Sequence, residues 1–348
     1  MASYTPLSLP YFAPSEELPA PLPSFEEIVS TKHKYLSLEY GRRVVLIDGG
    51  HYVAKWGSEI SVQEAENALF IQRNCPQARV PKVYAVYQRQ HLDTLEIRCT
   101  DYESEHREDG MQAHEEDAFL TPTTPQLITV VVMEYIPGQN LESIIHRLSP
   151  HDRNAITTTL AAQFTALRRV PQEQTPGLPP YFGSVGRRPY EGAPFWRGHS
   201  GPFTDASAYL AAVLDIGCGA ARRDARWTGD MEESYCALRD GLRGCVQAAD
   251  DGYATPVFTH ASIHPGDIIV ERKEGGEWAA CVVDLSGAGW HPAFWQCVSM
   301  DSGCRYDSEF WREVYQRMVP FYAQEEKLVL QSLALGKQDY LLDVEDED

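Results

Sequence analysis

Two segments in the second half of the chain constrain its fold more than any other part. Residues 257–270 read Val-Phe-Thr-His-Ala-Ser-Ile-His-Pro-Gly-Asp-Ile-Ile-Val, and residues 282–287 read Val-Val-Asp-Leu-Ser-Gly. Their polar residues are confined to the middle of the first segment and to Asp284, with short nonpolar runs on either side. Because short nonpolar runs bounded by turn residues are typical of buried strands, the pattern predicts a strand, a tight loop, a strand, a turn and a further strand.

The first half of the chain contains a predicted hairpin followed by a helix. Residues 42–47 and 51–56 are strand-like, and the Asp-Gly-Gly sequence at 48–50 between them is a strong signal for a tight turn. Lys55 lies near the end of the second strand, and the helix expected over residues 62–71 carries Glu64 and Glu66.

A continuous nonpolar run over residues 127–133 predicts a buried central strand, which leads into Met-Glu-Tyr-Ile-Pro-Gly at 133–138. Beyond it the pattern becomes helical. Ser149 and Pro150 have the residue types that begin a helix, and its expected buried face is formed by Ile156, Leu160, Phe164 and Leu167. Further helices are expected over residues 208–214 and 230–249.

These segments resemble the aminoglycoside phosphotransferase / choline kinase family, especially its divergent fungal branch. In that family the loop has the sequence His-Gly-Asp-Leu-His-Pro-Gly-Asn and is followed by an Ile-Asp-Trp type of turn. The residues of this chain that match are His260, His264, Pro265, Gly266 and Asp284. Residues 133–138 resemble its connector between lobes. The resemblance implies an α+β, protein-kinase-like two-lobe fold, with a small N-terminal antiparallel β-sheet lobe plus a helix and a larger, mainly helical C-terminal lobe.

The resemblance also implies a nucleotide site that holds ATP and magnesium. In kinase-like folds a strand lysine is held by a helix glutamate and aimed at the phosphates. Here that lysine is Lys55, with Glu64 as the expected partner and Glu66 as the alternative. The backbone of the connector would bind adenine, through Met133, Glu134 and Tyr135.

The catalytic-type loop departs from the family at two positions. Ser262 stands where the family has its catalytic Asp, and a serine hydroxyl cannot act as a base at neutral pH. Asp267 stands where the family has its metal-binding Asn, and its carboxylate together with Asp284 would form a dianionic magnesium site. His264 is a candidate substitute base and His260 a brace of the loop, although both are also normal structural histidines of the family.

Three functions therefore remain open. The first is ATP-dependent phosphoryl transfer to a hydroxyl of a small molecule, weakened by Ser262. The second is a pseudokinase-like binding protein, and the third is a family-fold enzyme repurposed for a non-phosphorylating reaction in small-molecule biosynthesis. Retention of Lys55, Glu64 and Asp284 favours the first two, whereas loss of the catalytic Asp favours the last two. The sequence does not name the acceptor or the oligomeric state.

The charge of the chain restricts its partners. A formal net charge of −20 argues against a nucleic-acid binder and against adhesion to anionic membranes. It mildly favours a cationic small-molecule ligand, which the resemblance places in the inter-lobe cleft. Without an apolar leader or a run of 18 apolar residues, a cytoplasmic protein is expected.

The expected domain organisation has four parts. Residues 1–32 form a proline-rich extension, expected to be extended and loosely packed or disordered, with a short helix beginning near Ser24. Residues 33–135 form the N-lobe, with an acidic insertion at about 100–120. Residues 136–342 form the C-lobe, and residues 343–348 form an acidic tail.

Overall fold

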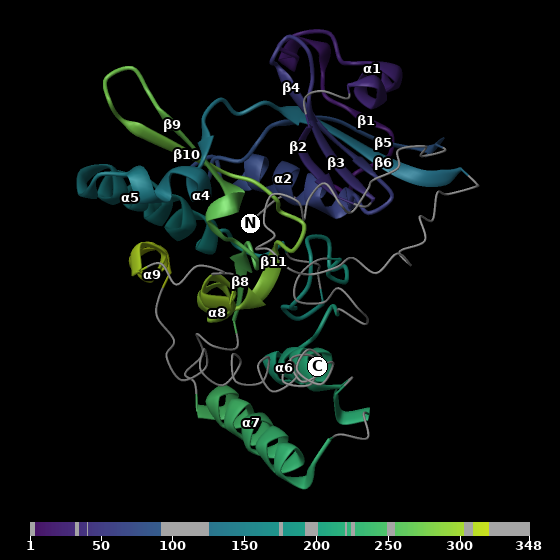
Figure 1. The fold of residues 1–348 in the computed structure, drawn as a ribbon. Coiled ribbons are helices and arrows are strands. Elements are labelled where there is room, and N and C mark those ends of the chain that lie inside the picture. Colours follow the sequence, from purple (N-terminus) through teal and green to yellow (C-terminus); the bar gives the residue numbers. More distant parts are fainter. Residues whose placement is uncertain are drawn as a thin grey trace, which may run out of the picture. The chain divides into compact units, whose positions relative to one another are not determined.

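The computed structural model describes residues 4–31, 35–39, 41–91, 125–173, 177–191, 201–219, 221–223, 227–248, 255–302 and 309–319. The expected acidic insertion and the acidic tail lie outside these residues. The chain divides into a larger unit, made of Met1–Pro6, Gln63–Lys82 and Ile136–Asp348, and a smaller unit, made of Leu7–Val62 and Val83–Tyr135. Figure 1 shows the elements of both units.

The smaller unit is built on one antiparallel sheet (Figure 1). Its strands are β1 (Tyr11–Phe12), β2 (Tyr35–Glu39), β3 (Arg42–Leu46), β4 (Tyr52–Gly57), β5 (Val83–His91) and β6 (Gln126–Glu134), in the spatial order β1-β5-β6-β4-β3-β2. The predicted hairpin is confirmed, because β3 and β4 pair in register from Arg43 opposite Trp56 to Leu46 opposite Val53. The predicted central strand is confirmed as β6, which lies between β4 and β5.

The proline-rich N-terminal segment is not loosely packed, and this expectation was wrong. Pro10 and Pro14 favour an extended backbone, which allows β1 to pair with β5 and the backbone N–H of Ala13 to donate to the carbonyl of Tyr84 at 2.8 Å. The short helix is confirmed as α1 (Phe25–Ser30), with a capping box formed by Ser24 and Glu27. The nonpolar side chains of this segment, buried against the sheet, supply the stabilisation that loose packing would lack.

The larger unit is mainly helical. Its α-helices are α2 (Val62–Asn74), α4 (Leu141–Ile144), α5 (Pro150–Arg168), α6 (Ala206–Cys218), α7 (Gly229–Ala248), α8 (Trp295–Ser302) and α9 (Glu309–Met318); only Val62, the first residue of α2, belongs to the smaller unit. Short 3₁₀ helices lie at Ile145–Arg147, Ala221–Arg223 and Pro265–Asp267 in the larger unit, and at Ser15–Glu17 in the smaller unit. Ser149 caps α5 by accepting from the N–H of Asp152, and the predicted buried face of this helix is confirmed. None of the described helices combines the length and hydrophobicity needed to cross a membrane.

The helix α2 groups with the larger unit, although the sequence assigned it to the N-lobe of residues 33–135. The reason is a polar face that sequence patterning does not reveal. Gln63, Glu66 and Asn67 lie on one side of the helix and bind groups of the larger unit. These contacts involve buried side chains, so they fix the helix firmly to that unit.

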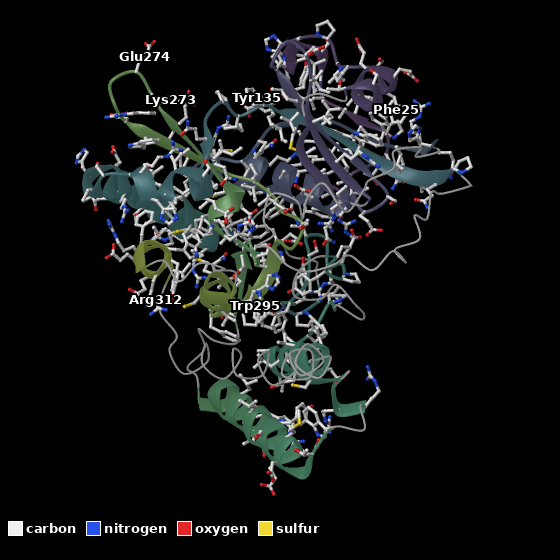
Figure 2. All side chains as sticks on the ribbon, in the orientation of Figure 1. Phe25, Tyr135, Lys273, Glu274, Trp295 and Arg312 are labelled. Carbon is white, nitrogen blue, oxygen red and sulfur yellow. The ribbon has the colours of Figure 1, made fainter. Side chains whose placement is uncertain are left out.

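Five strands complete the larger unit: β7 (Gln139–Asn140), β8 (Pro256–Thr259), β9 (Ile268–Arg272), β10 (Trp278–Val282) and β11 (Gly289–Pro292). They form a sheet in the order β10-β9-β7 and a pair of β11 with β8, all antiparallel. The predicted series of strand, loop, strand, turn and strand is thereby confirmed, and Figure 2 labels Lys273 and Glu274 at the tip of the β9–β10 hairpin. Nonpolar residues of β9 and β10 pack with α5 and α9 in one core, and α6, α7 and α8 contribute to another.

Candidate functional site

The loop between β8 and β9 is held by a fully buried histidine. The backbone N–H of His260 donates to Gln296 Oε1 at 2.8 Å, and its Nε2 donates to the carbonyl of Val283 at 2.9 Å. Burial lowers the pKa of His260, although the hydrogen bond to Val283 and the charge of Asp284 partly oppose this. The ring is therefore neutral near pH 7 and braces the loop against the segment that carries Asp284, which is the structural role that the sequence allowed for it.

The two acidic residues of the expected metal site come from neighbouring backbone. The N–H of Val283 donates to the carbonyl of Asp267 at 2.9 Å, which continues the pairing of β9 with β10 by one position. Asp284 is the next residue along the chain, so the backbone at 267 and the backbone at 284 lie side by side. Asp267 and Asp284 therefore lie at the same end of the β9–β10 hairpin.

The side chain of Asp267 is mostly buried and already has a partner on the loop. Its Oδ2 accepts the backbone N–H of His264 at 3.1 Å and lies 3.4 Å from His264 Nε2. The other ring nitrogen, His264 Nδ1, accepts the N–H of Gly266 at 3.0 Å. Since both nitrogens of a neutral ring are engaged within the loop, His264 is oriented as a structural cap of the short Pro265–Asp267 turn and has no free nitrogen to serve as a base.

Ser262 follows a residue in an unusual backbone conformation. Ala261 has φ +74° and is buried, in the left-handed region that favours glycine. The family motif has Gly at this place, whereas this chain adopts the left-handed backbone with a residue that carries a methyl group. Ser262 is half-buried at the bend. The position that the resemblance assigns to the catalytic residue therefore lies directly after this bend, and its side chain supplies a hydroxyl in place of a carboxylate.

Asp284 also has a left-handed backbone, with φ +58°, and the turn that follows it is fastened by two further buried side chains. Asn67 Nδ2 donates to the carbonyls of Leu285 at 2.8 Å and Ala288 at 2.9 Å. His291 Nε2 donates to the carbonyl of Gly287 at 3.1 Å. Asn67 and His291 are fully buried, so these bonds are protected from competition by water.

His291 is in turn held by aromatic residues. The hydroxyl oxygen of Tyr209 lies 2.9 Å from His291 Nδ1. Because the ring proton of His291 is on Nε2, which donates to Gly287, the Tyr209 hydroxyl is the donor to Nδ1. Tyr190 stacks on the imidazole with ring centroids 4.4 Å apart, and Trp295 of α8 stacks on it with centroids 6.3 Å apart. Burial lowers the pKa of His291 to about 3 and raises that of Tyr209 well above its usual range, so both groups are neutral.

The two candidate glutamates of α2 are both buried. Glu66 forms an ion pair with Arg188 and accepts a hydrogen bond from the Tyr4 hydroxyl at 3.1 Å. Burial raises the pKa of Tyr4, which keeps its hydroxyl protonated as the donor. Glu66 is thus committed to neighbours within the larger unit, and the expected role of Glu64 stays a prediction.

The remaining nucleotide-site candidates lie in the smaller unit. Lys55 is half-buried on β4, an interior strand, opposite Val44 and Val131. Because side chains alternate along a strand, Lys55 lies on the sheet face opposite to Ala54 and Trp56, which pack with the N-terminal segment. Met133 and Glu134 end β6 beside β4, and the N–H of Tyr135 donates to the carbonyl of His51 at 3.0 Å.

The structure therefore brings together the candidates of the loop and turn, namely His260, Ser262, His264, Asp267 and Asp284, within the larger unit. Lys55, Met133, Glu134 and Tyr135 belong to the smaller unit, and the geometry within each unit does not test their role. Across the described ranges, no group of three or more His, Cys, Asp or Glu side chains is arranged to hold a metal ion. The sequence interpretation missed Asn67, Gln296 and the bracing role of His291. No local sequence signal identifies Asn67, because its partners lie 218 and 221 residues away along the chain.

Several solved structures share this fold. The chain is similar to a thermostable mutant of aminoglycoside phosphotransferase APH(4)-Ia in ternary complex with ADP and hygromycin B, with a TM-score of 0.54, 12% identity, and coverage of 89% of this chain and 88% of that one. For a streptomycin–ATP–APH(2")-IIa ternary complex the TM-score is 0.53 and the identity 14%, with coverage of 91% of this chain and 95% of that one. For ADP-bound aminoglycoside phosphotransferase APH(2'')-Ib the same values are 0.51, 14%, 90% and 87%.

At these identities the likeness establishes the fold, and it confirms the expected α+β, kinase-like class. A search of curated protein sequences found no match to this chain. The model of the phosphotransferase enzyme family matches residues 77–319, well over half of the chain. This chain therefore belongs to the phosphotransferase enzyme family.

Proposed function

We propose that the protein binds a magnesium nucleotide and transfers a phosphoryl group from ATP to a hydroxyl of a small molecule, at a rate limited by the absence of a carboxylate at position 262. The observation that carries the proposal is the pairing of the loop with the Asp284 segment. Through the bonds of Val283 to Asp267 and His260, the residues that would hold the metal and face the acceptor are assembled on one rigid end of a hairpin.

The donor set suits magnesium. Asp267 and Asp284 offer carboxylate oxygens, the hard ligands that this ion prefers, and magnesium commonly takes one or two carboxylates together with phosphate oxygens. Such an ion would neutralise charge on the transferred phosphoryl group. Two neighbouring carboxylates without a cation would repel each other, so the presence of both at one hairpin end supports a cationic occupant. Lys55 and Glu64 are the proposed phosphate-positioning residues.

The proposed acceptor is a cationic, hydroxyl-bearing small molecule. Two of the similar structures contain hygromycin B and streptomycin, and the net charge of −20 would attract amine-bearing ligands. Phosphoryl transfer depends mostly on positioning and charge neutralisation, so loss of the base slows the reaction without removing its main sources of acceleration. General-base assistance contributes about 10² to 10⁴ in rate.

The test is to restore the base. Ser262→Asp should raise ATP turnover, with or without an aminoglycoside acceptor, by about 10²-fold. Ser262→Asn is the matched control, because it has the same shape as Asp but cannot accept the proton of a hydroxyl at neutral pH, and its turnover should stay near that of the unmodified protein. Turnover of Ser262→Asp no higher than that of Ser262→Asn would refute the proposed mechanism.

A second candidate function is nucleotide binding without chemistry. It is favoured by one observation, the engagement of both nitrogens of His264 within the loop, which leaves no substitute base there. Under this function, Mg-ATP should raise the thermal unfolding temperature, while neither variant turns ATP over. No response to Mg-ATP in any of the three proteins would instead favour a fold repurposed for a different ligand.

A further inference from the structure

One face of α2 is fixed to the larger unit by polar side chains at positions 63, 66 and 67. This spacing places them together on the helix surface. Gln63 donates from Nε2 to the carbonyl of Pro189 and accepts the N–H of Glu191, both at 3.0 Å. Glu66 pairs with Arg188. These two residues hold one neighbouring segment, residues 188–191. Asn67 instead donates to a different segment, and its Oδ1 accepts from the Ser184 hydroxyl at 3.5 Å.

Asn67 binds the turn that directly follows Asp284. Its Nδ2 carries two hydrogens, and the two carbonyls that accept from it belong to Leu285 and Ala288, the first and last residues of that turn. The N–H of Ala288 also donates to the carbonyl of Leu285 at 3.1 Å, which closes the turn on itself. Asn67 has 0% of its surface exposed. A single buried amide therefore spans both ends of the turn.

The conformation of Asp284 makes this support consequential. A non-glycine residue with φ +58° is in a sparsely populated backbone region, which persists only where the surroundings determine it. The carbonyl before Asp284 is held by His260, and the turn after it is held by Asn67 and His291. Because Asn67 belongs to α2, its two hydrogen bonds link that helix to the turn that directly follows Asp284.

We propose that Asn67 is a positioning residue for Asp284: by fastening the turn at residues 285–288 to α2, it fixes the carboxylate that would hold the metal. The consequence for magnesium rests on the proposed function, whereas the fixing of the turn does not. Groups that orient a metal ligand typically affect metal affinity by 10- to 100-fold. Removal of the amide should therefore weaken magnesium binding about 10-fold or more.

The experiment compares Asn67→Ala with Gln63→Ala. Both changes remove a buried α2 amide that makes two hydrogen bonds to backbone, so general destabilisation should be similar in the two variants. Amide hydrogen exchange of the protein without ligand is the first measurement. Asn67→Ala should accelerate exchange in the peptide around Ala288, and Gln63→Ala should instead accelerate it around Glu191. Unchanged protection at residues 284–290 in Asn67→Ala would overturn the positioning role.

The second measurement is the magnesium concentration that gives half of the Mg-ATP thermal shift. We expect it to rise about 10-fold in Asn67→Ala and to stay within about 2-fold of the unmodified protein in Gln63→Ala. Equal changes in both variants would mean that Asn67 acts only through stability. If Asn67→Ala does not fold, Asn67→Ser, which retains one donor, should show the same effects at smaller size. Absence of any Mg-ATP shift in the unmodified protein counts against the proposed function, and the exchange measurement still decides the role of Asn67.

Discussion

The buried His291 should make the protein lose stability in mildly acidic solution. In the native state its pKa is about 3, against about 6.5 for an ordinary histidine. Between pH 7 and pH 5 the unfolded chain therefore takes up a proton at this position, whereas the folded protein does not. Because the unfolded state binds more protons there, the free energy of unfolding decreases as the pH is lowered. The decrease from pH 7 to pH 5 that is due to His291 alone is about 2 kcal/mol. The contribution is absent above pH 7.

The groups around His291 do not offset this loss. Tyr190 and Tyr209 contact the ring, and burial raises both of their pKa values well above the usual range, so neither can become an anion that would stabilise a protonated imidazole. Trp295 stacks on the ring and does not titrate. Burial also lowers the pKa of His260, which acts in the same direction.

Urea denaturation at pH 7 and pH 5 measures the effect, with His291→Gln as the test variant. A glutamine can donate to Gly287 and accept from Tyr209 without titrating, so its loss of stability between the two pH values should be smaller than that of the unmodified protein by about 2 kcal/mol. His51→Gln, at an exposed histidine of the smaller unit, is the matched control and should behave as the unmodified protein. The reasoning is refuted if His291→Gln loses as much stability on acidification as the unmodified protein.

Two further substitutions test packing described above. Tyr209→Phe leaves His291 Nδ1 buried without its donor, and should lower the free energy of unfolding by about 2 kcal/mol in urea denaturation; an unchanged midpoint would show that the hydroxyl is not needed. Gly138→Ala places a Cβ 2.5 Å from the carbonyl oxygen of Val270 at φ +143°, and should cost about 2 kcal/mol or more. Gly275→Ala, at φ +100° with open space around the Cβ, is the matched control for backbone strain, and an equal loss in both variants would exclude the steric contact.

The elements that the sequence predicted well are those encoded by local patterns. The hairpin of β3 and β4 follows from Asp-Gly-Gly between strand-like runs, and α5 follows from a Ser-Pro start and a nonpolar stripe. The bend at Ser262 and the turn at Asp284 were placed correctly because polar residues interrupt otherwise nonpolar segments. Each of these signals lies within a few residues of the structure that it specifies.

The features that the sequence did not predict depend on partners far along the chain. Asn67 donates to carbonyls that lie 218 and 221 residues further along the chain, and the sequence around Asn67 does not indicate these partners. The N-terminal segment was expected to pack loosely on composition alone, but the pairing of Tyr11 with Val86 decides its conformation. His264 was a candidate base by position, and its engagement by Gly266 and Asp267 becomes visible only when the loop is folded.

The attachment of α2 to the larger unit has a consequence for how the chain matures during synthesis. The hydrogen-bond partners of Gln63 and Asn67, which include the carbonyls of Pro189, Leu285 and Ala288, are synthesised much later than the helix itself. This helix therefore leaves the ribosome long before its buried amides can form these hydrogen bonds. The chain also passes between the two units four times, since five successive segments alternate between them. A nascent chain that stops short of residue 288 therefore lacks a backbone carbonyl that the buried amide of Asn67 needs as its acceptor.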